Sequence, residues 1–190
     1  MCIRDSYQSM RKEAYQILKK RLQQLIIDEQ ENICFITAGQ LQEMIESGIT
    51  PNYAIKHIGL WNRQVEFIES ESPFSMPATF IEFGKIQWRS QGKGIQDAIL
   101  TIGLHVLTNA IPEGYDRELF HLDLLDKINY CLHGFNSGGC LGTLERTTSI
   151  PCHDHEEILD ETEVFRCVMT DDSAVKKQIK IKANPNITVS

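Results

Sequence analysis

The chain has 190 residues, of which 42% are apolar, and it carries a formal charge of −7 with a pI near 5.4. This length and apolar content suffice for one hydrophobic core and require no second domain. The acidic balance argues against a nucleic-acid-binding protein, because phosphate neutralisation needs a clustered basic face. No apolar run approaches the roughly 20 residues of a membrane span, and the N-terminus has no apolar signal core. We therefore expect a soluble protein that is not exported by a signal peptide.

Composition divides the chain into three parts. The first six residues, MCIRDS, are typical of an adapter remnant at the head of open reading frames from environmental sequencing, so residues 1–6 are treated as non-native. Residues 7–174 are predicted to form a single α/β domain. Residues 175–190 form a basic tail without acidic residues. Its four lysines leave −11 (−7 minus 4) on the rest of the chain, a sign asymmetry typical of a body with an interaction arm.

Six cysteines are scattered along the chain without any C-x-x-C pair: Cys2, Cys34, Cys131, Cys140, Cys152 and Cys167. A domain of this size does not depend on covalent cross-links for its stability. The spacing therefore favours reduced thiols in a cytosolic protein over a disulfide framework.

The first half of the domain contains two helical patterns and one strand. Apolar residues at helical spacing predict an amphipathic helix over residues 7–28, with a basic polar face. A weaker helical pattern covers residues 37–47, and Thr37 is a suitable N-cap for it. Alternation over residues 54–61 predicts the first strand. The acidic, turn-rich segment 62–77 is expected to be an exposed loop or β-extension.

The second half predicts a hairpin, a helix and two further strands. Residues 78–88 and 95–108 have strand patterns and are expected to pair across a glycine turn. A helix is predicted over residues 117–132, packed on the sheet through Leu119, Leu122, Leu125 and Ile128. Residues 141–150 and 161–170 alternate as the last strands. The expected fold is α/β (α+β), with a mixed, largely antiparallel sheet of about four to five strands flanked by two or three helices.

The segment CHDHEE after Pro151 is the strongest candidate for a metal site. Two histidines at i and i+2 point the same way on an extended strand, so His153 and His155, with Cys152, Cys140 or His133 nearby, could assemble a tetrahedral zinc site. Asp154 or Glu156 would then supply the carboxylate of a metal-dependent hydrolase. Spacing typical of zinc sites is absent, however, and a solvated loop between two strands is the favoured interpretation.

Other candidate chemistry is weaker. His121 and Asp123 diverge around the predicted helix, so they cannot cooperate directly. The triplet Gly92-Lys93-Gly94 lies between two strands and is interpreted as a turn, because no helix with a leading Ser or Thr follows it. His105 alternates with the apolar set of its strand and should face the opposite side of the sheet. We predict no catalytic residues, no cofactor and no metal.

The succession of elements resembles a known family. Its phrases are LWNRQVEFIES, PFSMPATFIEFGKIQW, GKGIQDAILTIGLHVLT, HLDLLDKINYCLHG and LERTTSIPCHDHEEILDETEVFRCVMTDDSA. Together they cover about residues 54–174 and are similar to tail terminator or tail completion proteins of tailed phages and prophages of Bacteroidetes. This broad group includes the minor tail protein U of lambda-like phages.

The resemblance implies a non-enzymatic structural protein that forms a ring, commonly a hexamer, on the tail tube and meets the head connector. It further implies residence in the virion tail, with assembly in the host cytoplasm, and no membrane or specific nucleic-acid partner.

A ring needs two different patches on each subunit. We predict that an acidic loop meets a basic first helix, through Glu66, Glu69 and Glu71 on one side and Arg11, Lys19, Lys20 and Arg21 on the other. A small protein-binding adaptor that uses the Lys176 to Lys182 arm is the remaining alternative.

Overall fold

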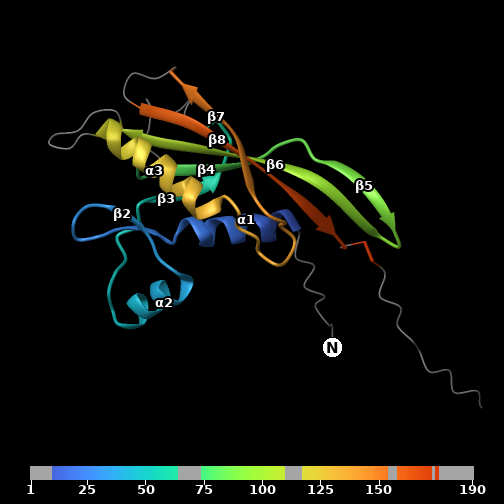
Figure 1. Cartoon of the computed structure of the whole chain (residues 1–190), viewed down its shortest axis with the longest axis horizontal. Helices are drawn as coiled ribbons and strands as arrows, with labels where there is room; N and C mark the ends of the chain where they lie inside the picture. Colours follow the sequence, from blue (N-terminus) through green and yellow to red (C-terminus); the bar gives the residue numbers. More distant parts are fainter. Residues whose placement is uncertain (1–9, 64–73, 110–116, 154–157, 173, 176–190) are drawn as a thin grey trace, which may run out of the picture.

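The computed structural model describes residues 10–63, 74–109, 117–153, 158–172 and 174–175. These residues form the elements drawn in Figure 1: α1 (Met10–Leu22), β1 (Leu25–Ile27), β2 (Ile33–Phe35), α2 (Ala38–Glu46), β3 (His57–Leu60), β4 (Ala78–Phe83), β5 (Gln87–Gly92), β6 (Ile95–Asn109), α3 (Arg117–Leu132), β7 (Glu145–Cys152) and β8 (Ile158–Asp171).

Six strands form the main sheet in the order β3-β4-β6-β8-β7, and β5 also pairs with β6. Only β3 and β4 run parallel, so the predicted mixed, largely antiparallel α+β fold is confirmed. The sheet has one strand more than expected. The predicted strand 78–88 divides at residues 84–86 into β4 and the start of β5, and both parts pair with β6. The predicted turn is present, because Gly92, Lys93 and Gly94 all have positive φ between the paired β5 and β6.

The first helix ends at Leu22, so the prediction of a helix to residue 28 was wrong. Leu25 and Ile26 continue the helical spacing, yet both are buried in strand β1, which pairs with β2. Asp28 explains the change of structure. Its Oδ1 accepts hydrogen bonds from the backbone N–H groups of Gln30 and Asn32, at 2.9 and 2.8 Å, which closes the turn between the two strands.

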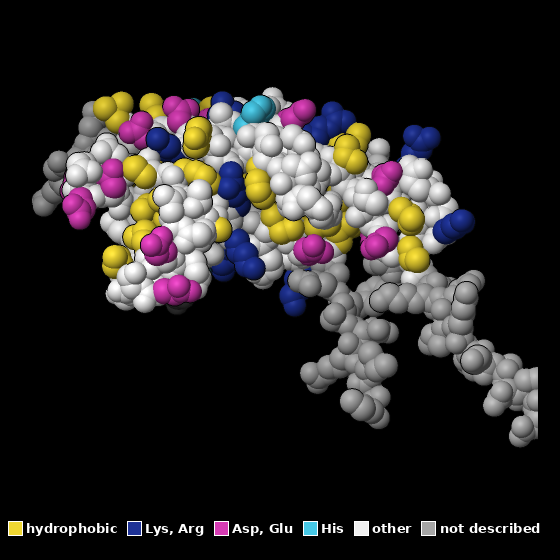
Figure 2. All heavy atoms as spheres, turned by 60° about the horizontal axis from the view of Figure 1, so that its bottom comes forward, with side chains coloured by type: hydrophobic (Ala, Val, Ile, Leu, Met, Phe, Trp, Pro, Cys, Tyr) yellow, Lys and Arg dark blue, Asp and Glu magenta, His cyan; other side chains and the backbone are white. Residues whose placement is uncertain are grey.

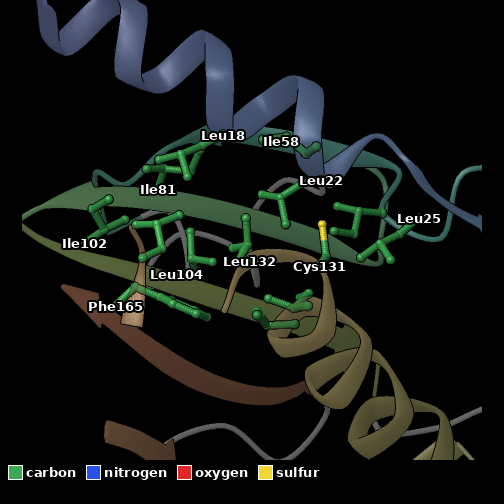
Figure 3. Packing of buried hydrophobic residues seen from close by; sticks show 14 of the residues in the cluster. Leu18, Leu22, Leu25, Ile58, Ile81, Ile102, Leu104, Cys131, Leu132 and Phe165 are labelled. Carbon is green, nitrogen blue, oxygen red and sulfur yellow. The ribbon is translucent and has the colours of Figure 1, made fainter. Parts of the chain in front are cut away.

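Helices α1 and α3 lie on the same face of the sheet, and the main core fills the space between them (Figure 1). Figure 3 shows Leu18 and Leu22 on α1, and Leu132 on α3, directed at the sheet. The sheet contributes Ile102, Leu104, Phe165 and other alternating residues to this core. The alternation predicted for β6 and β8 is confirmed, because the residues of one alternating set on each strand are buried: Leu100, Ile102, Leu104, Val106, Phe165, Cys167 and Met169.

The bounds of α3 match the prediction, but its buried face does not. Leu119 and Leu122 are 55% and 53% exposed, whereas Leu125 and Ile128 are buried. The helix instead turns its other side inward, through residues that recur at three- and four-residue spacing: His121, Leu124, Leu125, Ile128, Cys131 and Leu132. Leu125 and Ile128 belong to both the predicted and the observed buried face of α3. The observed face adds His121 and Cys131, which are buried.

The other face of the sheet carries no helix among the described residues. A small cluster covers one end of it, formed by Ala78, Phe80, Leu107 and Ile158 with Trp61, Phe74 and Met76. Farther along, the hairpin of β5 and the start of β6 extends away from the body, as an arm at the right of Figure 1. None of the helices in the described part of the chain is long and apolar enough to cross a bilayer.

The orientation of α3 can be tested with two leucines on the same helix. We expect Leu125→Ala to lower the free energy of unfolding by about 2–5 kcal/mol, because it removes a buried side chain and leaves a cavity. Leu122→Ala, at an exposed position, should change it by less than about 1 kcal/mol. Urea unfolding monitored by circular dichroism would measure both. Equal losses, or a larger loss for Leu122→Ala, would contradict the observed packing of α3.

Candidate functional site

The most tightly connected polar group on the helix-free face is centred on His105 of β6. Its Nε2 lies 2.9 Å from Oε2 of Glu82 on β4, and its Nδ1 lies 3.0 Å from Oγ1 of Thr162 on β8. The indole of Trp61, just after β3, stacks on the imidazole with 3.7 Å between ring centroids and 6° between planes. His105 therefore joins residues from four neighbouring segments of the sheet.

In its neutral form, His105 has one tautomer that satisfies both hydrogen bonds. An ionised carboxylate only accepts hydrogen bonds, so Nε2–H donates to Glu82 and the Thr162 hydroxyl donates to Nδ1. This order resembles that of a nucleophile, a base and an orienting carboxylate. The Trp61 ring covers one side of the imidazole, however, and the His105 side chain is only 12% exposed. The arrangement is thus well suited to fixing strands, and it confirms the prediction that His105 faces away from the main core.

The predicted metal ligands are only partly in the described part of the chain. Cys152 is the half-buried last residue of β7, and His153 follows it at an exposed position. His155, Asp154 and Glu156 lie outside the described residues. Within the ranges that the structure describes, no three His, Cys, Asp or Glu side chains are grouped to hold a metal ion. The zinc alternative and the prediction of no metal therefore both stay untested.

His121 and Asp123 point in different directions, as predicted from their spacing. His121 is buried and its Nδ1 lies 2.9 Å from Oγ1 of Thr108, while Asp123 is exposed. Burial lowers the pKa of the His121 imidazole below its ordinary value of 6.5, because desolvation disfavours the charged form. A neutral, bonded histidine in the core has a packing role.

The basic residues of α1 divide into two groups. Arg11 and Lys20 are exposed, on opposite sides of the helix because nine positions separate them, and Lys19 is half-buried. Arg21 instead makes contacts within its own chain. Its guanidinium lies 4.3 and 4.6 Å from the ring centroids of Phe35 and Phe135.

The Nε of Arg21 also donates to the carbonyl of Cys131 on α3, at 2.9 Å. Its position is therefore explained by the packing of α1 against β2 and α3. The acidic residues predicted to meet this helix, Glu66, Glu69 and Glu71, lie outside the described residues, so that contact stays a prediction.

A hollow of about 610 Å³ opens between the β1–β2 turn, Pro77 and the end of β6. Its polar lining includes Asp28 and Thr108, and both are already hydrogen-bonded within the chain. The backbone N–H of Asn32, followed by the thiol of Cys34, lowers the pKa of the Asp28 carboxyl. Asp28 therefore serves the β1–β2 turn, and Thr108 serves the core.

Comparison with known proteins gives no family for this chain. No family model matches it, and no curated protein shows a significant match. Among solved structures, it is similar to a chain described as "Virion of native gene transfer agent (GTA) particle", at 14% identity and a TM-score of 0.40. The similarity covers 60% of this chain and 78% of that chain. A likeness of this size supports no conclusion about the present chain.

Sequence reasoning placed His105 on the correct face but missed its partners. Glu82 and Thr162 lie 23 and 57 positions away along the chain, and only the pairing of β6 with β4 and β8 brings them together. In the sheet, Phe80 and Thr162 stand opposite His105, and Glu82 stands opposite Gly103 on the same face. The strand register is therefore the information that identifies the partners of His105. Register across nonlocal strands is not readable from a single sequence.

A stability measurement distinguishes a structural His105 from a reactive one. We expect His105→Ala to lower the free energy of unfolding by about 2–4 kcal/mol, because it removes two hydrogen bonds and the Trp61 stack. Glu82→Gln is the matched control. Glu82 is 49% exposed, so its loss of charge should cost less than about 1 kcal/mol. If His105→Ala left the stability unchanged, the structural role would be refuted.

Proposed function

We propose that this chain is a non-enzymatic virion protein, a tail terminator or tail completion protein that assembles as a ring on the tail tube at the head–tail junction. The observation that carries the proposal is the arm formed by β5 and the start of β6. All six residues of β5 are exposed, including Trp88 at 36%, and the strand is held in place by its pairing with β6. An exposed strand of this kind is suited to contacts with other protein chains.

The edges of the sheet fit the same interpretation. Within the described residues, β5 pairs only with β6, and β7 forms the opposite edge of the sheet beside β8. Most side chains of β7 are also exposed. The two edges differ in sequence and lie on opposite sides of β6. Head-to-tail contacts between different patches generate closed rings when the rotation between subunits permits closure.

The open face between these edges carries exposed apolar residues. Ile99 and Val168 stand opposite each other on β6 and β8, and they are 46% and 58% exposed. Ile150 on β7 is 51% exposed. Ile150 stands opposite Thr162, six positions along β8 from Val168, so the exposed apolar residues are spread along this face. Exposed apolar side chains on one surface favour a protein partner. The tail tube, the head–tail connector and further copies of the chain are the partners that the sequence resemblance implies.

The proposal predicts binding to tube ends. The full chain would be mixed with tail tubes assembled from the major tail protein of the same phage or prophage and imaged by electron microscopy. We expect ring-shaped density at one end of the tubes. A double change on the arm, Trp88→Ser with Arg89→Glu, should reduce the fraction of occupied ends because it alters an exposed contact surface.

The control for this experiment is Tyr130→Ser, which alters a 71% exposed aromatic residue on α3. It should leave tube-end binding unchanged. Absence of the wild-type protein from tube ends would contradict the proposed function. An equal loss in the arm variant and in the control would instead show that the arm is not the contact.

The metal-dependent hydrolase can be separated from this proposal by metal analysis. Protein purified without chelators should contain far less than one zinc per chain if residues 152–156 form a solvated segment. A zinc content near one equivalent that is lost in His153→Ala would favour the hydrolase, because ligand removal weakens a structural or catalytic site. His57→Ala provides the control, since His57 lies on β3, at the opposite end of the strand order from β7.

A further inference from the structure

The hairpin of β5 and the start of β6 ends in a tight turn with one charged side chain at its tip. Gly92 stands opposite Ile95, so Lys93 and Gly94 form the turn, and their φ angles are 53° and 87°. Positive φ at both positions is typical of a type I′ turn, whose first residue is usually Asn, Asp or Gly. The turn itself therefore does not favour a lysine at this position.

The tip is narrow around Lys93. The residue is exposed, and a Cβ atom at Gly92 would meet nothing within 4 Å. On the other side, a Cβ atom at Gly94 would collide with the backbone of Ala174, so the chain after β8 packs behind the turn. The triplet of residues 92–94 thus presents the lysine as its one side chain.

The β5 side of this arm is basic. Residues 84–96 contain no aspartate or glutamate and three exposed basic side chains: Lys85, Arg89 and Lys93. Asp97 follows on β6, and its carboxylate accepts hydrogen bonds from Gln91 and Thr170 at 2.8 and 2.9 Å. The acidic end of β8 lies on the other side of β6. Figure 2 shows basic side chains at the outer end of the arm, at the right of that view.

The hollow of about 610 Å³ lies at the other end of β6. Asn109, the last residue of β6, lines it, whereas the turn directly precedes Ile95, the first residue. The strand has 15 residues, which corresponds to roughly 45 Å between its ends. Figure 1 shows the β5–β6 turn at the right end of the molecule and the β1–β2 turn, which also lines the hollow, at the left. The tip therefore cannot reach the hollow of its own chain.

The hollow combines apolar walls with acidic side chains. Met76 and Pro77 supply apolar surface, and Asp28 and Glu31 of the β1–β2 turn supply negative charge. A lysine side chain suits such a surface, because its aliphatic stem packs on apolar groups while its ammonium group stays beside the carboxylates.

The chain around this hollow is predominantly acidic. Over residues 22–56 the one basic residue is Lys56, whose Nζ lies 2.6 Å from Oδ1 of Asn52, and the acidic residues are Asp28, Glu29, Glu31, Glu43 and Glu46. Figure 2 shows acidic side chains over the lobe at the left, opposite the arm. The two ends of the molecule thus differ in charge.

We propose that the β5–β6 turn of one copy docks in the hollow of a second copy of this chain. The Lys93 ammonium group would lie beside the carboxylates of Asp28 and Glu31, with its aliphatic stem against Met76 and Pro77. The projecting basic tip and the acidic hollow are complementary in shape and in charge. Because the two surfaces differ and lie at opposite ends of β6, the contact is head-to-tail and can repeat around a ring.

This inference rests on the proposed function only for the ring. Self-association is measured without any tail component, and tube-end binding is measured separately. A protein that binds tube ends but does not self-associate through the turn would overturn this contact alone. A protein that self-associates through the turn but never binds tube ends would contradict the proposed function alone.

Removal of the lysine charge without disturbance of the turn is the first test. Sedimentation velocity of the full chain over a wide range of protein concentrations should show reversible association that weakens as salt rises, because exposed charge pairs are screened. Lys93→Asn should raise the dissociation constant at least about tenfold. Because asparagine is favoured in a type I′ turn, the unfolding midpoint should stay unchanged or rise. Lys93→Arg keeps the charge and should retain most of the affinity.

Charge exchange tests the pairing of the tip with the hollow. Lys93→Glu and Glu31→Lys should each weaken association more than Lys93→Asn, because like charges then meet across the contact. In an equimolar mixture of the two reversed proteins, each tip meets an oppositely charged hollow on the other variant, so association should return. Asp28 is left unchanged because its carboxylate closes the β1–β2 turn.

The matched charge control is Asp126→Lys, at an exposed position on α3 that is not among the described residues lining the hollow. It should leave association unchanged. A monomeric wild-type protein at low salt and high concentration would overturn the proposal. Undiminished association of the Lys93→Glu protein, or a mixture that stays monomeric, would also overturn it and assign any self-association to another surface.

Discussion

The pairing of β6 with β8 is the interaction on which the rest of the structure depends. It runs without a register shift from Gln96 opposite Asp171 to Asn109 opposite Ile158. Because side chains alternate along both strands, this single register places one apolar set on the helix side and a different, mixed set on the other. The strands β4 and β5 then pair with one edge of this ribbon, and β7 pairs with the opposite edge.

Polar side chains on both faces of the sheet connect the β6–β8 pair to its neighbouring strands β4 and β7. On the helix-free face, His105 connects β6 to Glu82 of β4 and Thr162 of β8. At the other edge, Glu163 of β8 is 1% exposed and accepts from Ser149 at 2.6 Å and from Arg146 at 3.3 Å, both on β7.

Such a buried carboxylate needs its partners, because an unpaired buried charge is costly. Burial, followed by repulsion from Glu163, also raises the pKa of the neighbouring Glu161 carboxyl. Together with the apolar core, these contacts determine which strands lie next to each other in the sheet.

The sequence predicted the elements better than their orientation. The bounds of α3 were correct because its helical pattern is long and ends before Gly134, yet its buried side was assigned wrongly. Two stripes pass through Leu125 and Ile128 and contain equally many leucines, so apolar spacing alone did not show that Leu119 and Leu122 are exposed. The strands β1 and β2 were missed because each has only three residues, too few for a period of two to differ from helical spacing.

The candidate site was predictable only in part for a related reason. Alternation along β6 is local, so the side of the sheet that His105 faces could be read from the sequence. Its partners depend on nonlocal register, and the contacts of Arg21 with Phe35 and Phe135 depend on how α1 packs against distant segments. In contrast, α2 was predicted with its N-cap, because Thr37, Gln40 and Gly48 specify both ends through local hydrogen bonds.

The account separates a body that is held together by the sheet from the exposed strand β5, which is proposed to contact other chains. Hydrogen exchange of the full chain, measured at low and high protein concentration, tests this separation most directly. The account predicts that amides of β6 and β8 exchange slowly at both concentrations, because they open only with global unfolding. Amides of the exposed strand β5 should exchange more slowly at high concentration, where the proposed ring would cover this strand. Exchange in β5 that is independent of concentration, or exchange in β6 and β8 that is as fast as in β5, would contradict the account.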